Sequence, residues 1–146
     1  MPPPVVAALC AVVMWFAGRA VDRLDFDFPG RFALIVILVV AGILVGAIAF
    51  SLFTRARTTV NPLKPRETSA LVTRGLYRWT RNPMYLGMLI VLVAWALFVA
   101  NWLAFVGLPL FIVFINRFQI GPEERVLRER FGAQFEDYCG RVRRWL

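Results

Sequence analysis

The chain has 146 residues, a hydrophobic fraction of 60% and a formal net charge of +8. The length suits one domain, and the hydrophobic fraction lies above the roughly 45–50% of soluble globular domains, so the composition predicts a membrane protein. The chain lacks histidine, which excludes a histidine zinc site and a histidine general base, and its cations border apolar segments, which argues against a nucleic-acid partner.

Four apolar runs approach or reach the roughly 17–25 residues that cross a hydrocarbon core. In chain order they are Pro3–Ala20, Phe32–Phe53, Met84–Ala100 and Trp102–Phe118. We therefore predict an all-α fold, an integral membrane bundle of four transmembrane helices in a single domain covering residues 1–146. The first run lacks the positive n-region and cleavage site of a signal peptide, so we expect it to remain as a helix.

Most of the positive charge lies in two segments of the chain. Seven of the Arg and Lys residues lie in residues 54–83 and seven more lie between Arg117 and the C-terminus. The connection between the first two spans has three arginines, diluted by three aspartates. The positive-inside rule therefore predicts that both termini and the long loop are cytoplasmic.

Small and aromatic residues indicate how the spans pack. Gly42 and Gly46 are four residues apart in the second span, a spacing that lets helices approach closely, and packing within the chain is favoured over a homodimer contact. The sequence "ANW" at 100–102 is so short that the third and fourth spans must form an antiparallel hairpin. Trp95 and Trp102 are expected to anchor the membrane interface near that turn, and Pro109 to kink the fourth span.

Two segments outside the spans are expected to be ordered. The segment Thr54–Asn82 is long for a connection between neighbouring helices, and its second half is apolar enough to dock over the cytoplasmic end of the bundle. The last element is expected to begin at Gly121-Pro122. It should be an amphipathic helix whose apolar face consists of Leu127, Phe131, Phe135 and Tyr138.

Two proline-containing helix starts carry the polar residues of interest. Asn82 and Pro83 fit the N-cap and first position of the third span, because asparagine caps well and proline has no amide to lose there. Pro122 is expected to start the tail helix, with Glu123 and Glu124 in its first turn. The third span starts and the fourth ends on the same side, so the two helix starts are expected to meet.

The residues at this meeting point are complementary to S-adenosylmethionine. Helix amides and Arg81 favour a carboxylate, paired carboxylates favour an ammonium group or ribose hydroxyls, and aromatic faces favour a sulfonium or a purine. Tyr77, Trp79 and Tyr85 are the nearby aromatic residues. Each residue also has an ordinary structural interpretation, as a helix cap, a charged first turn, a snorkelling arginine or a belt tyrosine.

The stretches "LVTRGLYRWTRNPMYLG" and "PEERVLRERFGAQFEDYCGRVRRWL" resemble the isoprenylcysteine carboxyl methyltransferase and phospholipid methyltransferase group, over roughly Thr59 to Leu146. Members are integral membrane enzymes that transfer methyl from S-adenosylmethionine. The resemblance implies a cofactor-binding catalytic core at 54–146 behind two N-terminal spans at 1–53, in a bacterial inner membrane. It implies cofactor binding by Tyr77, Arg81, Asn82, Pro83, Tyr85, Gly87, Glu123 and Glu124. Arg81, Tyr85 and Glu124 are the expected catalytic residues. The proton of an amine or thiol acceptor could be taken by Glu123, Glu124 or Tyr85, and the sequence leaves this choice open.

One departure from the group concerns the possible acceptor. The eukaryotic enzymes have Arg-His-Pro where this chain has Arg-Asn-Pro, and Asn82 cannot titrate near neutral pH. A prenylated-cysteine carboxylate is therefore less favoured, and a lipophilic carboxylate, amine or thiol stays open as acceptor; no metal ion is required. The alternative is a non-catalytic membrane scaffold that assembles with partners through Gly42, Gly46 and the basic tail, and a homodimer through the same glycines stays open.

Overall fold

The computed structural model describes residues 1–55 and 71–146, which confirm the all-α class. The helices are α1 (Pro3–Ala20), η1 (Asp22–Leu24), α2 (Arg31–Arg55), η3 (Gly75–Arg78), α3 (Pro83–Val99), η4 (Trp102–Val106), α4 (Gly107–Ile115), η5 (Asn116–Ile120), α5 (Gly121–Phe131) and α6 (Ala133–Arg141). In this part of the chain, three helical stretches are long and apolar enough to cross a membrane, and α3 is a shorter apolar helix.

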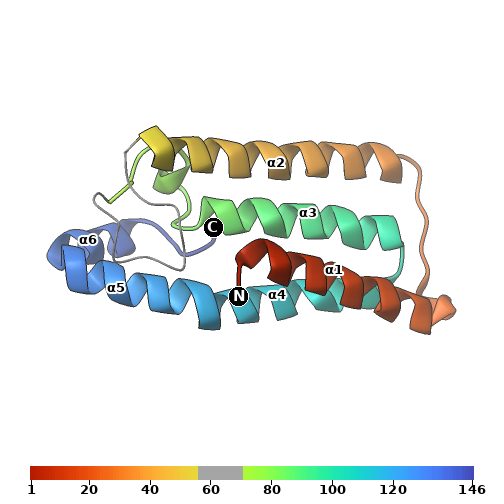
Figure 1. The fold of residues 1–146 in the computed structure, drawn as a ribbon. Helices are drawn as coiled ribbons and strands as arrows, with labels where there is room; N and C mark the ends of the chain where they lie inside the picture. Colours follow the sequence, from red (N-terminus) through yellow and green to blue (C-terminus); the bar gives the residue numbers. More distant parts are fainter. Residues whose placement is uncertain (56–70) are drawn as a thin grey trace.

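Helix α3 lies at the centre of the bundle (Figure 1). Helix α2 packs along one side of α3, and α1 and α4 pack along the other, with α1 also resting on α4 and η4. The hairpin between the third and fourth spans is confirmed, because Ala100 ends α3 in the left-handed conformation at φ 60°. The hydrophobic core contains buried residues of α1, α3 and α4, among them Met14, Leu92, Ala96, Phe111 and Ile115.

The contact between α2 and α3 depends on glycines in both helices. A Cβ atom added to Gly42 would lie 2.7 Å from the carbonyl oxygen of Gly87, and one added to Gly87 would lie 2.7 Å from the carbonyl oxygen of Gly42. The two backbones therefore touch, as expected for small residues at a membrane helix contact. The favoured interpretation of Gly42 as a packing residue within the chain is confirmed.

The expected anchoring role of Trp95 is wrong, and the kink expected at Pro109 stays a prediction. The indole of Trp95 donates a hydrogen bond from Nε1 to the carbonyl oxygen of Ala11, 2.9 Å away, so it joins α3 to α1 instead of anchoring an interface. Pro109 is the third residue of α4, directly after the 3-10 helix η4. A first turn needs no intrahelical donor, so this position tolerates proline better than a helix interior does.

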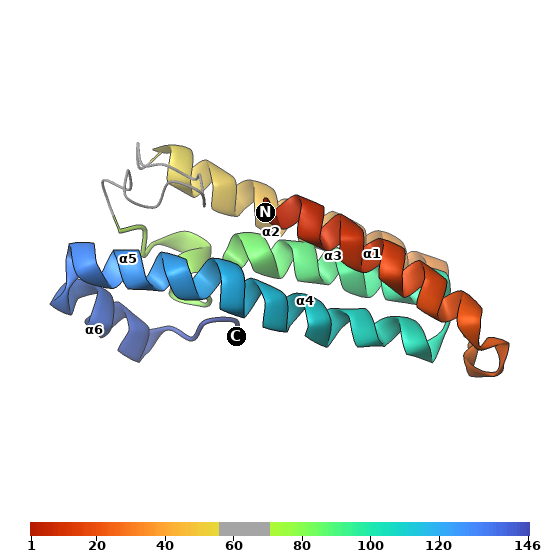
Figure 2. The same ribbon diagram turned by 60° about the horizontal axis from the view of Figure 1, so that its bottom comes forward.

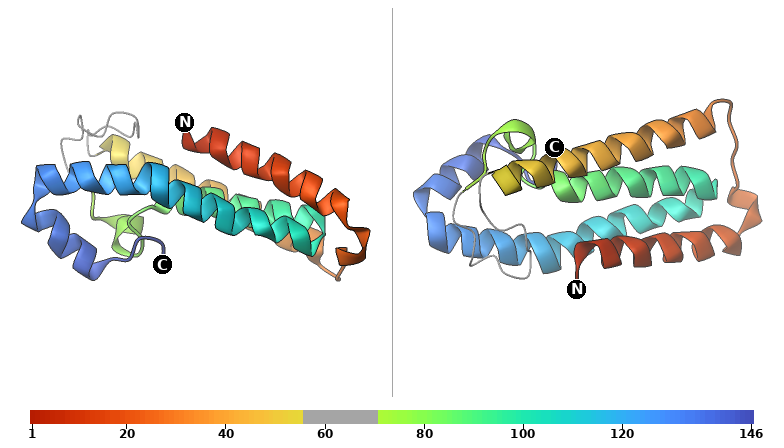
Figure 3. Two further views of the ribbon diagram at one scale, coloured as in Figure 1. Left: turned by 90° about the horizontal axis from the view of Figure 1, so that it is seen from below. Right: turned by 45° about the horizontal axis from the view of Figure 1, so that its top comes forward.

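The fourth span continues without a break into the expected tail helix, so Pro122 does not start a separate element. Ile120 and Gly121 have helical backbone angles, and the chain is helical from Trp102 to Phe131. A π-helical turn, η5, precedes Pro122. Its wider hydrogen-bond spacing lets the helix continue although the proline has no backbone amide to donate. Figures 2 and 3 show α4 and α5 as one long rod.

The rod formed by η4, α4, η5 and α5 is longer than the hydrocarbon core of a bilayer is thick. Thirty helical residues measure roughly 45 Å, against about 30 Å for a hydrocarbon core. Six of the eleven residues of α5 are charged, and they lie at this far end. Helix α5 is therefore the part of the rod that lies beyond the apolar span, next to the start of α3.

The expected single amphipathic helix at the C-terminus is divided by Gly132, whose backbone has φ +50°. Helix α6 turns back below α5 after this residue (Figure 2). The predicted apolar residues nevertheless gather in one cluster, in which Phe135, Tyr138 and Val142 are buried against Leu71, Leu127, Phe131 and Cys139. Leu71 and η3 therefore bring the second half of the long loop to the bundle, while residues 56–70 lie outside the described part.

The glycine contact predicts a clear difference between two neighbouring substitutions. Gly42→Ala should lower stability by about 1–3 kcal/mol, because its new methyl would collide with the Gly87 carbonyl of α3. Gly46→Ala is the matched control, since a Cβ there meets no atom within 4 Å. Thermal unfolding of the purified variants in detergent measures the difference. Equal unfolding temperatures for Gly42→Ala and the wild type would contradict the close contact.

Candidate functional site

The expected meeting of the third span with the two glutamates is confirmed. The Tyr85 hydroxyl donates a hydrogen bond to Oε1 of Glu123, 2.6 Å away, and Nη2 of Arg81 lies 3.2 Å from Oε1 of Glu124. These residues come from the start of α3 and the start of α5, about 40 positions apart. The last residues of the chain join them, and Figure 1 shows the C-terminus beside the start of α3.

Glu124 is a buried carboxylate held between two guanidinium groups. Arg144 donates to it twice, from Nε to Oε1 at 3.1 Å and from Nη2 to Oε2 at 2.5 Å, and Arg81 approaches from the other side. The Glu124 residue is only 9% exposed. The hydrogen bonds to Glu124 raise the pKa of Arg144. Two cations around one anion leave this cluster with a net positive charge, which favours an anionic ligand group.

Arg81 has a buried donor that the protein leaves unsatisfied. Its Nε atom is buried and has no hydrogen-bond partner among residues 1–55 and 71–146, although the side chain is 15% exposed and its Nη2 pairs with Glu124. Buried donors are almost always paired, because an unpaired one loses its hydration without compensation. An acceptor supplied by a ligand at this place would satisfy the guanidinium.

Asn82 occupies the N-cap position of α3, as predicted, but its side chain does not cap the helix. Instead its Nδ2 donates to the carbonyl oxygen of Arg144 at 2.9 Å, and the Thr80 hydroxyl donates to the same carbonyl at 3.2 Å. The first-turn amides of α3 are therefore not taken by a side-chain cap. A helix start in this condition can bind an anion.

The last four residues, Arg143 to Leu146, form a C-terminal strap across the start of α3. The backbone carbonyl of Arg143 accepts a hydrogen bond from the amide of Arg81 at 3.0 Å. The indole Nε1 of Trp145 donates to Oδ1 of Asn116 at 3.0 Å, in the π-helical turn η5. The strap therefore fixes both sides of the site, α3 through backbone contacts and the long rod through Trp145.

The strap residues were missed as site residues by the sequence reasoning. Arg144 was counted only as one of the basic residues that set topology, and Thr80 as part of the loop. The ending Arg144-Trp145 did form part of the resemblance, and this was the one signal that pointed to it. No spacing rule links residue 144 to residue 124, so only the fold could bring them together.

The remaining expected residues lie at different distances from this cluster. Tyr77 is buried in η3, where its ring meets Phe53 edge to face and its carbonyl oxygen accepts a hydrogen bond from the Tyr138 hydroxyl at 2.7 Å. Burial raises the pKa of both tyrosines above their usual range. Trp79 is 76% exposed and does not enclose the site. Gly87 lies in the α2–α3 contact, so helix packing accounts for it.

Comparison with known proteins gives a family match over most of the chain. The family model described as phospholipid methyltransferase matches residues 31–134. A probable protein-S-isoprenylcysteine O-methyltransferase of Oryza sativa subsp. indica is 30% identical over 106 residues, which cover 73% of this chain and 56% of the rice protein. Protein-S-isoprenylcysteine O-methyltransferase B of Arabidopsis thaliana is 33% identical over 91 residues, 60% of this chain and 45% of the relative.

A bacterial relative covers a shorter part of the chain. An uncharacterized protein of Haemophilus influenzae is 48% identical over 63 residues, which are 43% of this chain and the whole of that protein. The match spans about half the length of the plant relatives. No solved structure matches the chain significantly.

The strap contacts predict a difference between two adjacent arginines. Arg144→Ala should destabilise the folded chain by about 1 kcal/mol or more, because it leaves the buried Glu124 carboxylate with one cation. Arg143→Ala should be nearly neutral, since Arg143 contributes its backbone carbonyl and its residue is exposed. Thermal unfolding combined with limited proteolysis of the C-terminus measures both. Equal protection of the two variants would contradict the strap.

Proposed function

The chain belongs to the phospholipid methyltransferase family, and on this premise we propose that it uses S-adenosylmethionine to methylate a lipophilic acceptor that reaches the site from the membrane. The main observation in favour of this cofactor is the buried Nε of Arg81, which has no hydrogen-bond partner in the described part of the chain and lies beside the uncapped start of α3. Both features call for an anionic acceptor atom, and the amino-acid carboxylate of the cofactor is such a group.

The residues of the site fit the other parts of this cofactor as well. Glu123 and Glu124 supply carboxylate oxygens for an ammonium group or ribose hydroxyls, and Tyr85 is a buried aromatic ring next to them. The cofactor supplies an electrophilic methyl group bound to a sulfonium. When the methyl group is transferred, the sulfur leaves as a neutral thioether. The protein has to orient the acceptor and exclude water, and positioning of this kind can contribute roughly 7–11 kcal/mol.

The two glutamates have different surroundings, which assigns them different parts in the proposal. Glu124 is paired with Arg81 and Arg144, so both of its carboxylate oxygens are already engaged by guanidinium groups. Glu123 accepts a hydrogen bond from Tyr85 and has no cationic partner in the described part of the chain. Where the acceptor is an amine or a thiol, Glu123 is therefore the residue that would take its proton. An acceptor carboxylate would need no such step.

The proposed sidedness follows from charge and from the position of the site. The site lies at the end of the bundle where the charged helix α5 and the arginines of the C-terminal strap gather. The positive-inside rule assigns such an end to the cytoplasm, where S-adenosylmethionine is made available. Placement in a bacterial inner membrane with a cytoplasmic site is part of the proposal, as is the transfer to a lipid-borne acceptor.

Cofactor binding can be tested directly on the purified protein. Calorimetry in detergent should detect binding of S-adenosylhomocysteine to the wild type, and Arg81→Ala and Glu124→Gln should each abolish it, because they remove the anion site and its buried partner. Arg78→Ala and Glu129→Gln are matched controls, since Arg78 is an exposed arginine three residues before Arg81 and Glu129 is an exposed glutamate of α5, the helix that contains Glu124. Unchanged binding in both site variants, or no binding to a folded wild type, would contradict the proposal.

The proton acceptor can be tested separately from cofactor binding. Glu123→Gln should still bind S-adenosylhomocysteine, because its amide oxygen can replace the carboxylate oxygen as a hydrogen-bond acceptor. It should methylate an amine or thiol acceptor at least about 100-fold more slowly, as expected for loss of a general base. The acceptor itself would first be identified by incubating the protein with methyl-labelled cofactor and a membrane extract, then finding the labelled lipid. A Glu123→Gln enzyme with unchanged turnover would remove Glu123 from the mechanism.

A further inference from the structure

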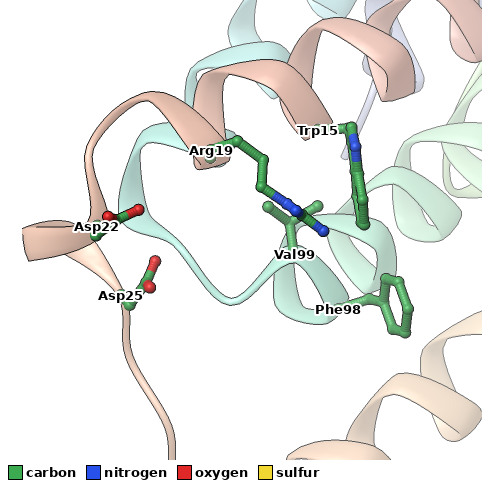
Figure 4. A pocket seen from close by; sticks show the side chains of 7 residues that line it. Trp15, Arg19, Asp22, Asp25, Phe98 and Val99 are labelled. Atoms are coloured by element: carbon green, nitrogen blue, oxygen red, sulfur yellow. The ribbon is translucent and has the colours of Figure 1, made fainter.

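A polar cavity lies at the end of the bundle opposite to the proposed methyl-transfer site. It has a volume of about 220 Å³ and lies where α1 and α3 end and the connection to α2 begins (Figure 4). Its lining consists of Trp15, Gly18, Arg19, Asp22, Asp25, Phe98 and Val99. The cavity is at the boundary of the apolar spans, the depth at which phospholipid headgroups lie.

The charged groups of the cavity are not paired with each other. The Arg19 guanidinium lies over the indole of Trp15, with its central carbon 4.3 Å from the ring centroid. Stacking of this kind leaves the N–H groups of an arginine free at their edges. In the described part of the chain, the Asp22 carboxylate has no hydrogen bond or ion pair. Figure 4 shows Asp22 and Asp25 on the side of the cavity away from Trp15.

The second aspartate is fixed by the fold. Asp25 accepts a hydrogen bond at Oδ1 from the side-chain amide of Asn101, 2.7 Å away, and Asn101 is fully buried at the turn after α3. The same amide donates to the carbonyl oxygen of Val21 at 2.9 Å. These bonds tie the connection after α1 to the hairpin after α3, so the cavity wall is preorganised.

An aromatic row forms the apolar floor of the cavity. Trp15 and Phe98 line the cavity, and Trp95 contacts both, with ring centroids 6.0 Å from Trp15 and 5.3 Å from Phe98. The one polar atom of Trp95 is already bound to the Ala11 carbonyl, so this row offers apolar surface toward the membrane. Phe98 is 47% exposed there.

We propose that this cavity binds the headgroup of a zwitterionic, amine-bearing phospholipid, with the phosphate at Arg19, the ammonium group between Asp22 and Asp25, and the glycerol and acyl region along the aromatic row. An unpaired cation and an unpaired anion facing one cavity are complementary to a ligand with both charges. An anionic headgroup without an amine could pair its phosphate with Arg19 but would bring no cation to face the two aspartates. The bound lipid would belong to the leaflet opposite to the methyl-transfer site.

The proposal is tested by lipid binding to the full chain in detergent, without methyl donor. Short-chain phosphatidylethanolamine should bind the wild type, and Arg19→Gln and Asp22→Asn should each weaken binding about tenfold, since each loses one charge-assisted contact. Arg23→Gln is the matched control, because Arg23 is an exposed arginine of the same connection that does not line the cavity. Thermal unfolding of each variant confirms that it is folded.

Two further ligands test whether the cavity requires the amine of the headgroup and whether it requires the lipid chains. Phosphatidylglycerol of the same chain length should bind the wild type more weakly than phosphatidylethanolamine, and soluble phosphoethanolamine should bind more weakly than the lipid. Binding that is insensitive to both Arg19→Gln and Asp22→Asn would overturn the proposal, as would equal affinity for phosphatidylglycerol. Soluble phosphoethanolamine binding as tightly as the lipid would assign the cavity to a soluble ligand and overturn the lipid proposal too.

Discussion

One buried carboxylate joins the three segments that build the site. Glu124 lies on α5, Arg81 directly precedes α3, and Arg144 belongs to the C-terminal strap, so this ion cluster connects positions that are distant in the chain. Removing one partner of a buried ion pair is far more costly than removing the whole pair, because the remaining charge stays desolvated. The cluster therefore requires all three segments to be in place at once.

The positions of these charges follow from the apolar part of the bundle. Glycine contacts bring α2 against α3, and the tight turn at Ala100 returns the chain so that α4 runs antiparallel to α3. Continuous helix from η4 to α5 then carries the two glutamates past the apolar span to the level where α3 begins. The π-helical turn also contacts both chain ends, since Gln119 donates to the Met1 carbonyl and Asn116 accepts from Trp145. π-Helical turns are common at functional sites, and this one fixes the rod beside the cluster.

Apolar patterning and turn chemistry predicted the class of fold, the first three spans and the meeting of the start of α3 with the two glutamates. Those features depend on local composition, so a sequence expresses them directly. The errors have a different origin. Gly121-Pro122 has the pattern of a helix start, but a preceding π-helical turn can accommodate a proline without ending the helix. Asn82 has the pattern of a cap, but the Arg144 carbonyl takes its amide. The role of Arg144 depends on a contact across twenty residues and two helices, which no local pattern records.

The central claim is that Arg81 and the start of α3 receive the carboxylate of S-adenosylmethionine. An experimental structure of the chain with S-adenosylhomocysteine bound tests it most directly. The account predicts the amino-acid carboxylate within hydrogen-bonding distance of Nε of Arg81 and the first amides of α3, with Glu123 and Glu124 facing the rest of the molecule. A ligand bound elsewhere, with that Nε still lacking a partner, would contradict the account.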